Sequence, residues 1–219
     1  MTLWETFLDH RGDQLPKWTH YFPIYERHFA PWRNRSFTFL EIGVLRGGSA
    51  HMWTRYFGPL ATIVGVDIDP ACQQYQGLNV KVRIGDQSDP AFLQSVIDEF
   101  GVPDVVLDDG SHQQHHVNTT FEFLYPRMRK DSIYMIEDLH CSYWDSHGGG
   151  LNNPNTFINK SKAYIDQLNI QFTNGELAPN PVLANTFSIS YYNSIVVLEK
   201  GNSDFAQGIY NQYGNVTIY

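Results

Sequence analysis

Blocks of apolar residues alternate along the chain with blocks in which apolar and polar residues are mixed. The apolar blocks are short and rich in β-branched residues, which is typical of buried strands. We expect strands at residues 36–44, 61–67, 80–86, 103–109 and 131–138. The mixed blocks predict helices at residues 49–57, 89–101, 113–129 and near 155–168. Strands that are apolar throughout and separated by helices indicate a parallel sheet covered on both faces.

Single residues mark where two of the predicted helices begin and end. Asp89 is a good N-cap for the helix at 89–101, and Gly101 stands where that helix should stop. Pro126 should end or bend the helix at 113–129, because proline lacks the backbone N–H that a helix interior needs. These helices should therefore have sharply defined ends.

The last strand-like stretch has a different character from the others. Residues 187–201 contain two β-rich runs joined at Tyr192 and Asn193, which is typical of a hairpin. Such a hairpin would add antiparallel strands to the edge of the sheet. The predicted fold class is therefore α/β, with a mostly parallel seven-stranded sheet, helices on both faces and an antiparallel terminal hairpin.

Composition limits the kind of partner and the compartment. The 219 residues fit one large domain, and an apolar fraction of 42% is enough for a sizeable core. A formal charge of -8 disfavours binding to nucleic acid or to an anionic membrane. No apolar run approaches the ~20 residues that span a bilayer, and the N-terminus lacks the features of a signal peptide. Cys72 and Cys141 form no framework, so we expect a soluble cytoplasmic protein without a nucleic-acid or membrane partner.

Acidic residues stand at the end of every strand predicted for the parallel core. Ligands of such sheets bind beyond the carboxyl ends of the strands, so these acids should share one rim. Asp69 and Asp86 could each be an ordinary helix cap. Helix capping explains the whole set poorly, because carboxylates gathered at one rim repel one another unless a cation or a hydrogen-bonding ligand is present. The acids at the strand ends are Glu41, Asp67, Asp86, Asp108, Asp109, Glu137 and Asp138.

The turn after the first strand contains three glycines, but not at the spacing of a dinucleotide site. A GxGxxG sequence would present backbone N–H groups to a pyrophosphate. Here Gly43 is followed by Gly47 and Gly48, and Glu41 precedes them. The carboxylate of Glu41 would repel a pyrophosphate and suits a cationic ligand. The turn therefore favours a different cofactor class.

This E-x-G-x-x-x-G arrangement, with an acid ending the next strand, resembles the class I S-adenosylmethionine-dependent methyltransferases. The resemblance implies a Rossmann-like fold and a binding site for that methyl donor. In such a site Asp67 would accept hydrogen bonds from the ribose hydroxyls, and Asp86 would lie near the adenine. We assign Asp108 to the cofactor side as well. The expected cofactor-binding residues are Glu41, Gly43, Gly47, Ser49, Asp67, Asp86 and Asp108.

Three further motifs, "DDGSHQQHH", "IEDLHCSYW" and "GGG", resemble the metal-dependent sugar O-methyltransferases of the macrocin and mycinamicin type. The resemblance runs from "KWTHYFPIYERHF", at about residue 17, to the closing "SIVVLEKG". It implies that Asp109, Glu137 and Asp138 bind Mg²⁺ and that His112 is the general base. The sequence departs from the larger relatives in showing no extra N-terminal domain. It also carries Cys141 where we would expect threonine, and these differences leave the acceptor open.

The residue chemistry supports a metal site without the family. Neighbouring strands lie ~4.8 Å apart, so the tips of two strands can share one ion. Three carboxylates form a hard, oxygen-rich site that favours Mg²⁺. Zinc is the alternative, because His112, His115 and His116 are close in sequence, but no cysteine accompanies them. We expect His115 and His116 to lie at the surface or behind the ligands.

The remaining candidates concern the acceptor. His140, Tyr143 and Trp144 could stack on a sugar face and bind its hydroxyls, or they could form a buried aromatic hinge. We divide the chain into an N-terminal helical segment, residues 1–35, that covers the active site, and a methyltransferase core, residues 36–219. The aromatic residues of the first segment could equally serve packing or a contact between subunits of a homo-oligomer.

The sequence thus predicts an S-adenosylmethionine- and Mg²⁺-dependent O-methyltransferase. Its acceptor would be a sugar hydroxyl of a glycosylated natural product or a related saccharide. Two alternatives stay open: an O-methyltransferase of a catechol or polyketide phenol, and a non-methylating relative similar to the cephalosporin-tailoring proteins.

Overall fold

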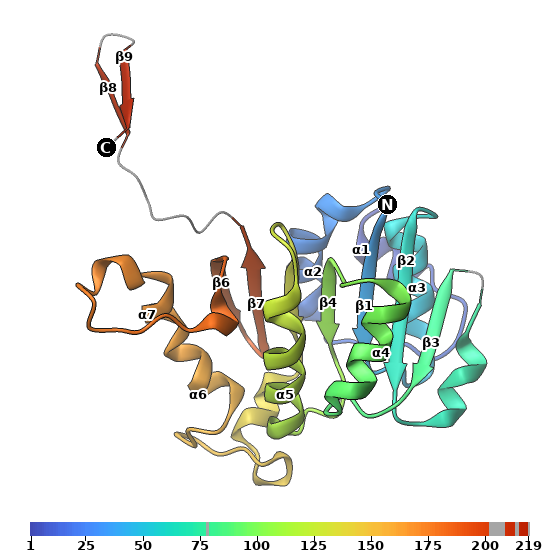
Figure 1. Cartoon of the computed structure of the whole chain (residues 1–219). Helices are drawn as coiled ribbons and strands as arrows, with labels where there is room; N and C mark the ends of the chain where they lie inside the picture. The colour runs from blue at the N-terminus through green and yellow to red at the C-terminus, as the bar shows by residue number, and fades with distance from the viewer. Residues whose placement is uncertain (78, 202–208, 213–214, 219) are drawn as a thin grey trace.

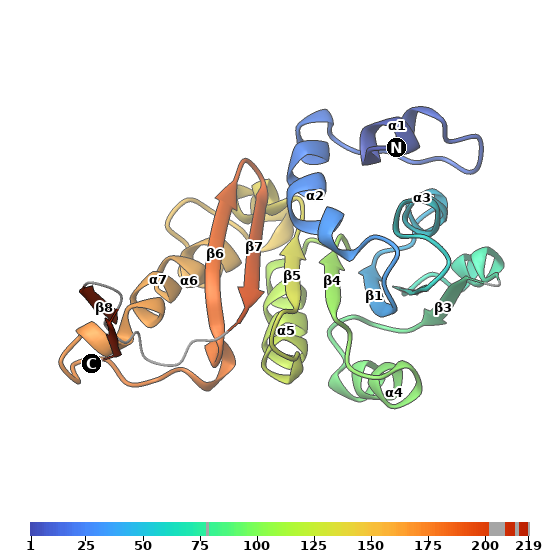
Figure 2. The same ribbon diagram turned by 90° about the horizontal axis from the view of Figure 1, so that it is seen from above.

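A computed structural model describes residues 1–77, 79–201, 209–212 and 215–218. Its centre is a seven-stranded sheet in the order β3-β2-β1-β4-β5-β7-β6. The first five strands are parallel, and β7 runs antiparallel to both β5 and β6, as the arrows of these three strands show in Figure 2. Figure 1 shows the same molecule from the side. This topology confirms the predicted fold class. The strands are β1 Phe37–Ile42, β2 Ala61–Asp67, β3 Val80–Ile84, β4 Val105–Asp108, β5 Ile133–Ile136, β6 Thr186–Tyr192 and β7 Ile195–Lys200.

The register of the parallel strands brings their carboxyl ends to one level. Ile42 of β1 pairs with Asp108 of β4, and Asp108 pairs with Ile136 of β5. On the other side of β1, Ile42 pairs with Val66 of β2. The residues that follow these strands therefore emerge side by side, which is what the predicted rim of acids requires.

Helices cover both faces of the sheet (Figure 2). One face carries the N-terminal helices and α3, and the other carries α4 and α5, with α6 and α7 beside β6. The helices are α1 Leu3–Leu8, α2 Phe22–Phe29, α3 Gly48–Phe57, α4 Pro90–Phe100, α5 Gln114–Leu124, α6 Phe157–Lys162 and α7 Tyr164–Leu168. Short 3₁₀ turns are η1 Thr19–Tyr21, η2 Ala30–Trp32, η3 Pro70–Tyr75, η4 Tyr125–Arg127, η5 Leu139–Tyr143, η6 Asp145–His147, η7 Ile170–Phe172 and η8 Pro181–Leu183.

Aromatic side chains fill much of the core. Under the N-terminal helices, Phe29, Phe39, Trp53 and Phe57 are fully buried and their ring centroids lie 5.0–6.0 Å apart. Buried aromatic pairs of this geometry add to the hydrophobic stabilisation from their area alone. The aromatic fraction of 15% therefore reflects packing to a large extent.

The predicted helix ends agree with the structure. The Asp89 side chain accepts a hydrogen bond from Ala91 N at the start of α4, and Gly101 follows its last turn with φ +82°. α5 stops at Leu124, and Pro126 lies in the 3₁₀ turn beyond it. The helix predicted near 155–168 is divided, because α6 and α7 are separate helices.

A second sheet lay outside the prediction. β8, Ile209–Gln212, and β9, Asn215–Ile218, pair with each other in an antiparallel hairpin. The predicted core, residues 36–219, includes residues 78, 202–208, 213–214 and 219, which lie outside the described part.

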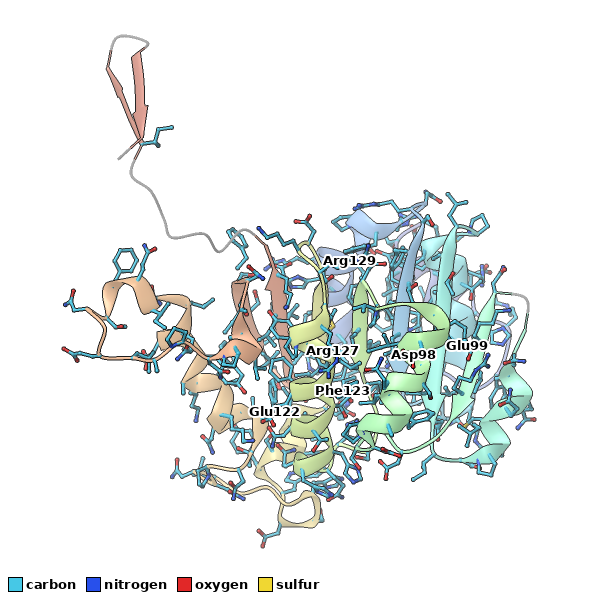
Figure 3. All side chains as sticks on the ribbon, viewed as in Figure 1. Asp98, Glu99, Glu122, Phe123, Arg127 and Arg129 are labelled. Atoms are coloured by element: carbon cyan, nitrogen blue, oxygen red, sulfur yellow. The ribbon has the colours of Figure 1, made fainter. Side chains whose placement is uncertain are left out.

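The outer surface of α4 and α5 is charged. Figure 3 labels Asp98 and Glu99 on α4, Glu122 on α5, and Arg127 and Arg129 in the segment that follows α5. Arg129 pairs with Asp104 at 2.5 Å, and the guanidinium of Arg127 lies 3.8 Å from the centre of the Phe123 ring. Among the described residues, no helix has the length and apolar character needed to cross a membrane.

Candidate active site

A cavity of about 960 Å³ lies beyond the carboxyl ends of the parallel strands. Its size falls within the usual range for small-molecule sites. Residues 14–18 of the N-terminal segment form part of its wall. Of the predicted site residues, the wall contains Gly43, Ser49, Asp67, Asp86, Asp109, His112, Glu137 and Asp138.

The turn after β1 is built around a contact that only glycine permits. Gly43 has φ +94°, and a Cβ atom there would lie 2.1 Å from the backbone oxygen of Asp109. The turn therefore packs directly on the tip of β4. Gly47 is the N-cap residue of α3, just behind the cavity wall, and Ser49 follows in the first turn of that helix. The glycines thus bring the start of α3 close to the strand that carries the predicted metal ligand.

Asp67 holds this turn in place. Its Oδ2 accepts hydrogen bonds from Val44 N at 2.8 Å and Leu45 N at 3.0 Å, and its Oδ1 accepts one from Asp69 N. Burial raises the pKa of this carboxyl, but the three backbone donors outweigh burial and leave the pKa lowered. Asp67 is therefore an anion fixed at the cavity wall, where its remaining lone pairs could accept from a ribose.

The next two acids along the rim also make local hydrogen bonds. Asp69 caps η3 by accepting from Ala71 N at 2.9 Å, as a helix cap does. Asp86 accepts from both the backbone N and the side-chain Oγ of Ser88 at 2.7 Å, and these bonds lower its pKa. Asp86 nevertheless lines the cavity, so its other oxygen can still face a ligand.

Two predicted cofactor residues are buried behind the wall. Glu41 is fully buried, with Trp53 Nε1 donating to its Oε1 at 3.0 Å, and Oε2 finds no partner of hydrogen-bonding geometry among the described residues. Burial raises the Glu41 pKa to about 7, and the charge of Lys17 opposes that rise. Asp108 accepts from Gln87 and Tyr134 at 3.2 Å, and burial raises its pKa to about 7. The structure thus places Asp108 away from the cavity.

Asp109, His112 and Asp138 come together in the wall of the cavity. One ligand atom from each lies within 4.8 Å of the other two. His112 Nε2 is 3.8 Å from Asp109 Oδ1 and 3.7 Å from Asp138 Oδ2. Two carboxylate oxygens and an imidazole nitrogen at this spacing could hold a divalent cation. The strand tips have therefore brought together three of the four residues assigned to the metal and the base.

The backbone at this cluster is strained. His112 has φ +56° and Asp138 has φ +52°, in the left-handed region that residues with a side chain seldom adopt. Such conformations persist where the surrounding structure enforces them, and they are concentrated at functional sites. Burial lowers the pKa of His112, and the charges of Asp109 and Asp138 oppose this shift in part. His112 is therefore a neutral imidazole at neutral pH.

Glu137, the remaining predicted ligand, is buried and has partners for both oxygens. Lys17 Nζ donates to Glu137 Oε2 at 2.8 Å and to Asp109 Oδ2 at 2.5 Å, and Tyr25 donates to Glu137 Oε1. Burial and the charge of Asp109 raise the pKa of Glu137, and Lys17 opposes this rise. Tyr21 donates to Asp138 Oδ1 at 2.5 Å. The N-terminal segment thus supplies a donor to each of the three carboxylates.

These N-terminal donors were missed by the sequence reasoning. The aromatic stretch from Trp18 to Trp32 predicts a cover for the acceptor, packing or a subunit contact, and no pattern in the sequence assigns a role to Lys17. A lysine next to an aromatic run gives no sign that its ammonium group reaches the rim of a sheet more than ninety residues further along the chain. The only available signal was its position at the start of the resemblance.

The predicted acceptor residues do not line the cavity, although His140 lies beside Asp138, which does. His140 Nδ1 is hydrogen-bonded to Ser194 Oγ at 2.6 Å and lies 3.8 Å from Asp138 Oδ1. The His140 ring is 4.7 Å from the Trp144 ring and 6.1 Å from the Trp18 ring. Tyr143 and Trp144 are each 49% exposed, so they do not form a buried hinge.

The other two histidines of the "HQQHH" sequence start α5. His115 is exposed, whereas His116 lines the cavity and is hydrogen-bonded through Nδ1 to Ser111 Oγ at 2.8 Å. The metal-competent cluster found among the described residues contains neither of them.

Known proteins resemble this chain in sequence and in fold. The chain is 40% identical over 156 residues to 8-demethyl-8-alpha-L-rhamnosyl tetracenomycin-C 2'-O-methyltransferase of Streptomyces olivaceus, covering 68% of this chain and 41% of that protein. It is 34% identical over 198 residues to mycinamicin VI 2''-O-methyltransferase of Micromonospora griseorubida, covering 84% and 49% respectively. No profile of a known protein family matches the sequence.

The structure matches that of MycE, a methyltransferase of the mycinamycin pathway solved with Mg and SAH. The TM-score is 0.84 at 31% identity, covering 94% of this chain and 56% of that one. The seven-stranded sheet with its antiparallel end is thus that of the class I methyltransferases. By sequence and fold, the chain resembles the sugar O-methyltransferases represented by these proteins of the tetracenomycin and mycinamicin pathways, as its motifs indicated. It spans about half the length of the curated relatives it matches.

Proposed function

We propose that this chain is an S-adenosylmethionine- and Mg²⁺-dependent O-methyltransferase whose acceptor is a sugar hydroxyl of a glycosylated natural product. The observation that carries the proposal is the cluster of Asp109, His112 and Asp138 in the wall of the cavity beyond the parallel strands. It combines hard ligands for a cation with a neutral base. The relatives support the acceptor class, since another structure of MycE holds mycinamycin VI together with Mg and SAH.

The donor set suits magnesium. Asp109 Oδ1 and Asp138 Oδ2 face each other across the cluster, and Glu137 is the next carboxylate along the same rim. Carboxylate oxygens are the ligands that Mg²⁺ prefers, whereas a nitrogen ligand is not. We therefore assign the three carboxylates to the metal and leave His112 free. A divalent cation bound there would lower the pKa of an acceptor hydroxyl that contacts it.

The methyl donor would occupy the inner part of the cavity. Asp67 and Asp86 both line the cavity, where Asp67 would accept from the ribose hydroxyls and Asp86 would lie near the adenine. The buried Glu41, one oxygen of which has no partner of hydrogen-bonding geometry in the part of the chain that the structure describes, lies behind the turn where a positively charged group would be stabilised. The donor's sulfonium would then lie between the turn after β1 and the acceptor hydroxyl.

His112 would accept the proton. As the acceptor oxygen takes the methyl group from the sulfonium, the hydroxyl proton passes to Nε2 of His112. The lowered pKa of His112 keeps its imidazole neutral and ready for this step. Asp109 and Asp138 lie less than 4 Å from Nε2, so their charges would stabilise the imidazolium that forms.

The test is a screen of glycosylated natural products with the methyl donor and Mg²⁺, read by the mass gain of one methyl group. Methylation of a sugar acceptor, lost on chelation with EDTA and restored by Mg²⁺, supports the proposal. Asp138→Asn should abolish the reaction, while the matched surface variant Asp98→Asn on α4 should retain it. If the protein methylates a catechol or polyketide phenol in preference to every sugar, its acceptor is a phenol and the sugar assignment is wrong. Full activity after exhaustive chelation would refute the metal assignment.

A further inference from the structure

Lys17 is the basic side chain whose ammonium group lies inside the carboxylate rim. Its side chain is only 3% exposed, and Nζ bridges Asp109 Oδ2 and Glu137 Oε2 at 2.5 and 2.8 Å. The Tyr25 ring lies 5.9 Å away, so the ammonium group is enclosed by anions and an aromatic face. Nζ therefore forms an ion pair with each of the two carboxylates.

The segment that carries Lys17 has a fixed path over the start of α3. The backbone oxygens of Asp13 and Gln14 lie so close to Gly48 that a Cβ atom there would be 2.7 and 2.5 Å from them. Because Gly48 has no side chain, the N-terminal chain can pass directly against the start of α3. From this position the Lys17 side chain enters the cavity wall, while the neighbouring Trp18 is 57% exposed.

The ammonium group occupies the place of a bridging cation. A magnesium ion bound by Asp109 and Glu137 would lie ~2.1 Å from an oxygen of each. Lys17 Nζ already contacts one oxygen of each at 2.5 and 2.8 Å. The other Glu137 oxygen accepts from Tyr25, so each Glu137 oxygen already has a hydrogen-bond donor while Lys17 stays in place. Two cations cannot share these oxygens without strong repulsion.

From this we infer that Lys17 is an internal cation that exchanges with the divalent metal. In the metal-free protein it neutralises Asp109 and Glu137 and fastens the N-terminal segment over the site. When the metal takes Glu137 as a ligand, Lys17 leaves the rim and its segment is released from the wall of the cavity. Lys17 thus acts through the metal carboxylates as a positioning residue. This inference rests on the metal site of the proposed function.

Exposure of the amine tests the exchange directly in the unmodified chain. Lysines are acetylated with an N-hydroxysuccinimide ester, without metal and at saturating Mg²⁺, and each site is quantified by mass spectrometry. We expect Lys17 to be protected without metal and at least fivefold more reactive with Mg²⁺. The exposed Lys162, whose Nζ donates to Asn159 on α6, should react equally in both conditions. Continued protection of Lys17 at saturating Mg²⁺ would overturn the inference.

Metal affinity provides a second readout. Lys17→Met removes the competing charge and keeps the length of the side chain, so Mn²⁺ should bind at least fivefold more tightly by calorimetry. Lys162→Met changes the net charge equally at a distant place and should leave the affinity unchanged. Lys17→Gln, which can still donate to the carboxylates, replaces Lys17→Met if that variant does not fold. Equal or weaker Mn²⁺ binding by the Lys17 variant would overturn the exchange.

The two proposals fail in different ways. If neither the wild-type protein nor any variant binds Mn²⁺, both the metal-dependent function and the exchange are refuted. If wild-type protein binds Mn²⁺ while Lys17 stays protected, the metal site stands and only the exchange is refuted. In that case Asp109, His112 and Asp138 would hold the ion without Glu137.

Discussion

Replacing His112 by asparagine should remove the base while preserving the backbone. His112 has φ +56°, a conformation that asparagine tolerates better than alanine does. Asparagine is also neutral and cannot take up a proton near pH 7. His112→Asn therefore isolates proton transfer from backbone strain, which a change to alanine would confound.

The expected magnitude follows from the position of the ring. His112 Nε2 faces two carboxylates at 3.7–3.8 Å and is 22% exposed, so it is placed to take a proton from a hydroxyl in the cavity. General-base catalysis contributes about 10²–10⁴-fold, so kcat should fall by that factor, or roughly 3–5 kcal/mol in activation free energy. Mn²⁺ affinity should change less than about tenfold, because the carboxylate ligands remain.

The assay is methyl transfer at saturating donor, acceptor and Mg²⁺, over a range of pH. The wild-type rate should fall as the pH drops through the His112 pKa, because the protonated ring is no base. Burial lowers that pKa, so the fall should come below the ordinary value of roughly 6.5. His115→Asn is the matched control at an exposed position and should keep its rate. If His112→Asn retains wild-type kcat, the base is elsewhere and His140 is the next candidate.

Three further predictions concern the fold, its pH dependence and the acceptor. Gly43→Ala should lower the free energy of unfolding in urea by more than about 2 kcal/mol, because φ is +94° and the new Cβ would meet a backbone oxygen; an unchanged value would contradict this packing. The hydrogen bond from His28 lowers the Glu199 pKa in the folded protein. The Glu199 carboxylate therefore stabilises the fold at pH values above its unfolded pKa of roughly 4.3, and this stabilisation is lost as the pH falls through its folded pKa. Glu199→Gln should therefore lose less stability than wild type between neutral and acidic pH, and equal losses would refute it. Trp144→Ala should raise the acceptor KM about fivefold, as expected for about 1 kcal/mol of stacking, and an unchanged KM would remove Trp144 from the acceptor site.

Much of the parallel core could be predicted from the sequence, because the signals for it are local. Apolar runs separated by mixed segments define buried strands and their covering helices, and the acidic residues that end the strands mark one rim of the sheet. Asp89 and Pro126 marked helix ends correctly, because a cap and a missing N–H act within one turn. The division between α6 and α7 and the β8–β9 hairpin were not predicted.

Tertiary structure decided which carboxylate oxygens face the cavity and which are hydrogen-bonded inside the protein. The register of β1, β4 and β5 sets Asp109 and Glu137 side by side, but the sequence could not show that Glu137 would be buried with both oxygens hydrogen-bonded. Asp108 and Asp109 are neighbours in the chain, yet one is enclosed behind the wall and the other faces the cavity, because successive side chains near a strand end point to opposite sides.

The position of Lys17 is the clearest case of a contact that the sequence alone does not predict. The sequence by itself determined that carboxylates would gather at one rim and need a cation. Only the folded chain decided that a lysine from the N-terminal segment would reach between Asp109 and Glu137. Its position depends on the path of the segment past Gly48, a long-range contact that no local pattern encodes. The sequence of the strand ends thus shows that carboxylates need a cation, whereas tertiary packing decides that Lys17 supplies it.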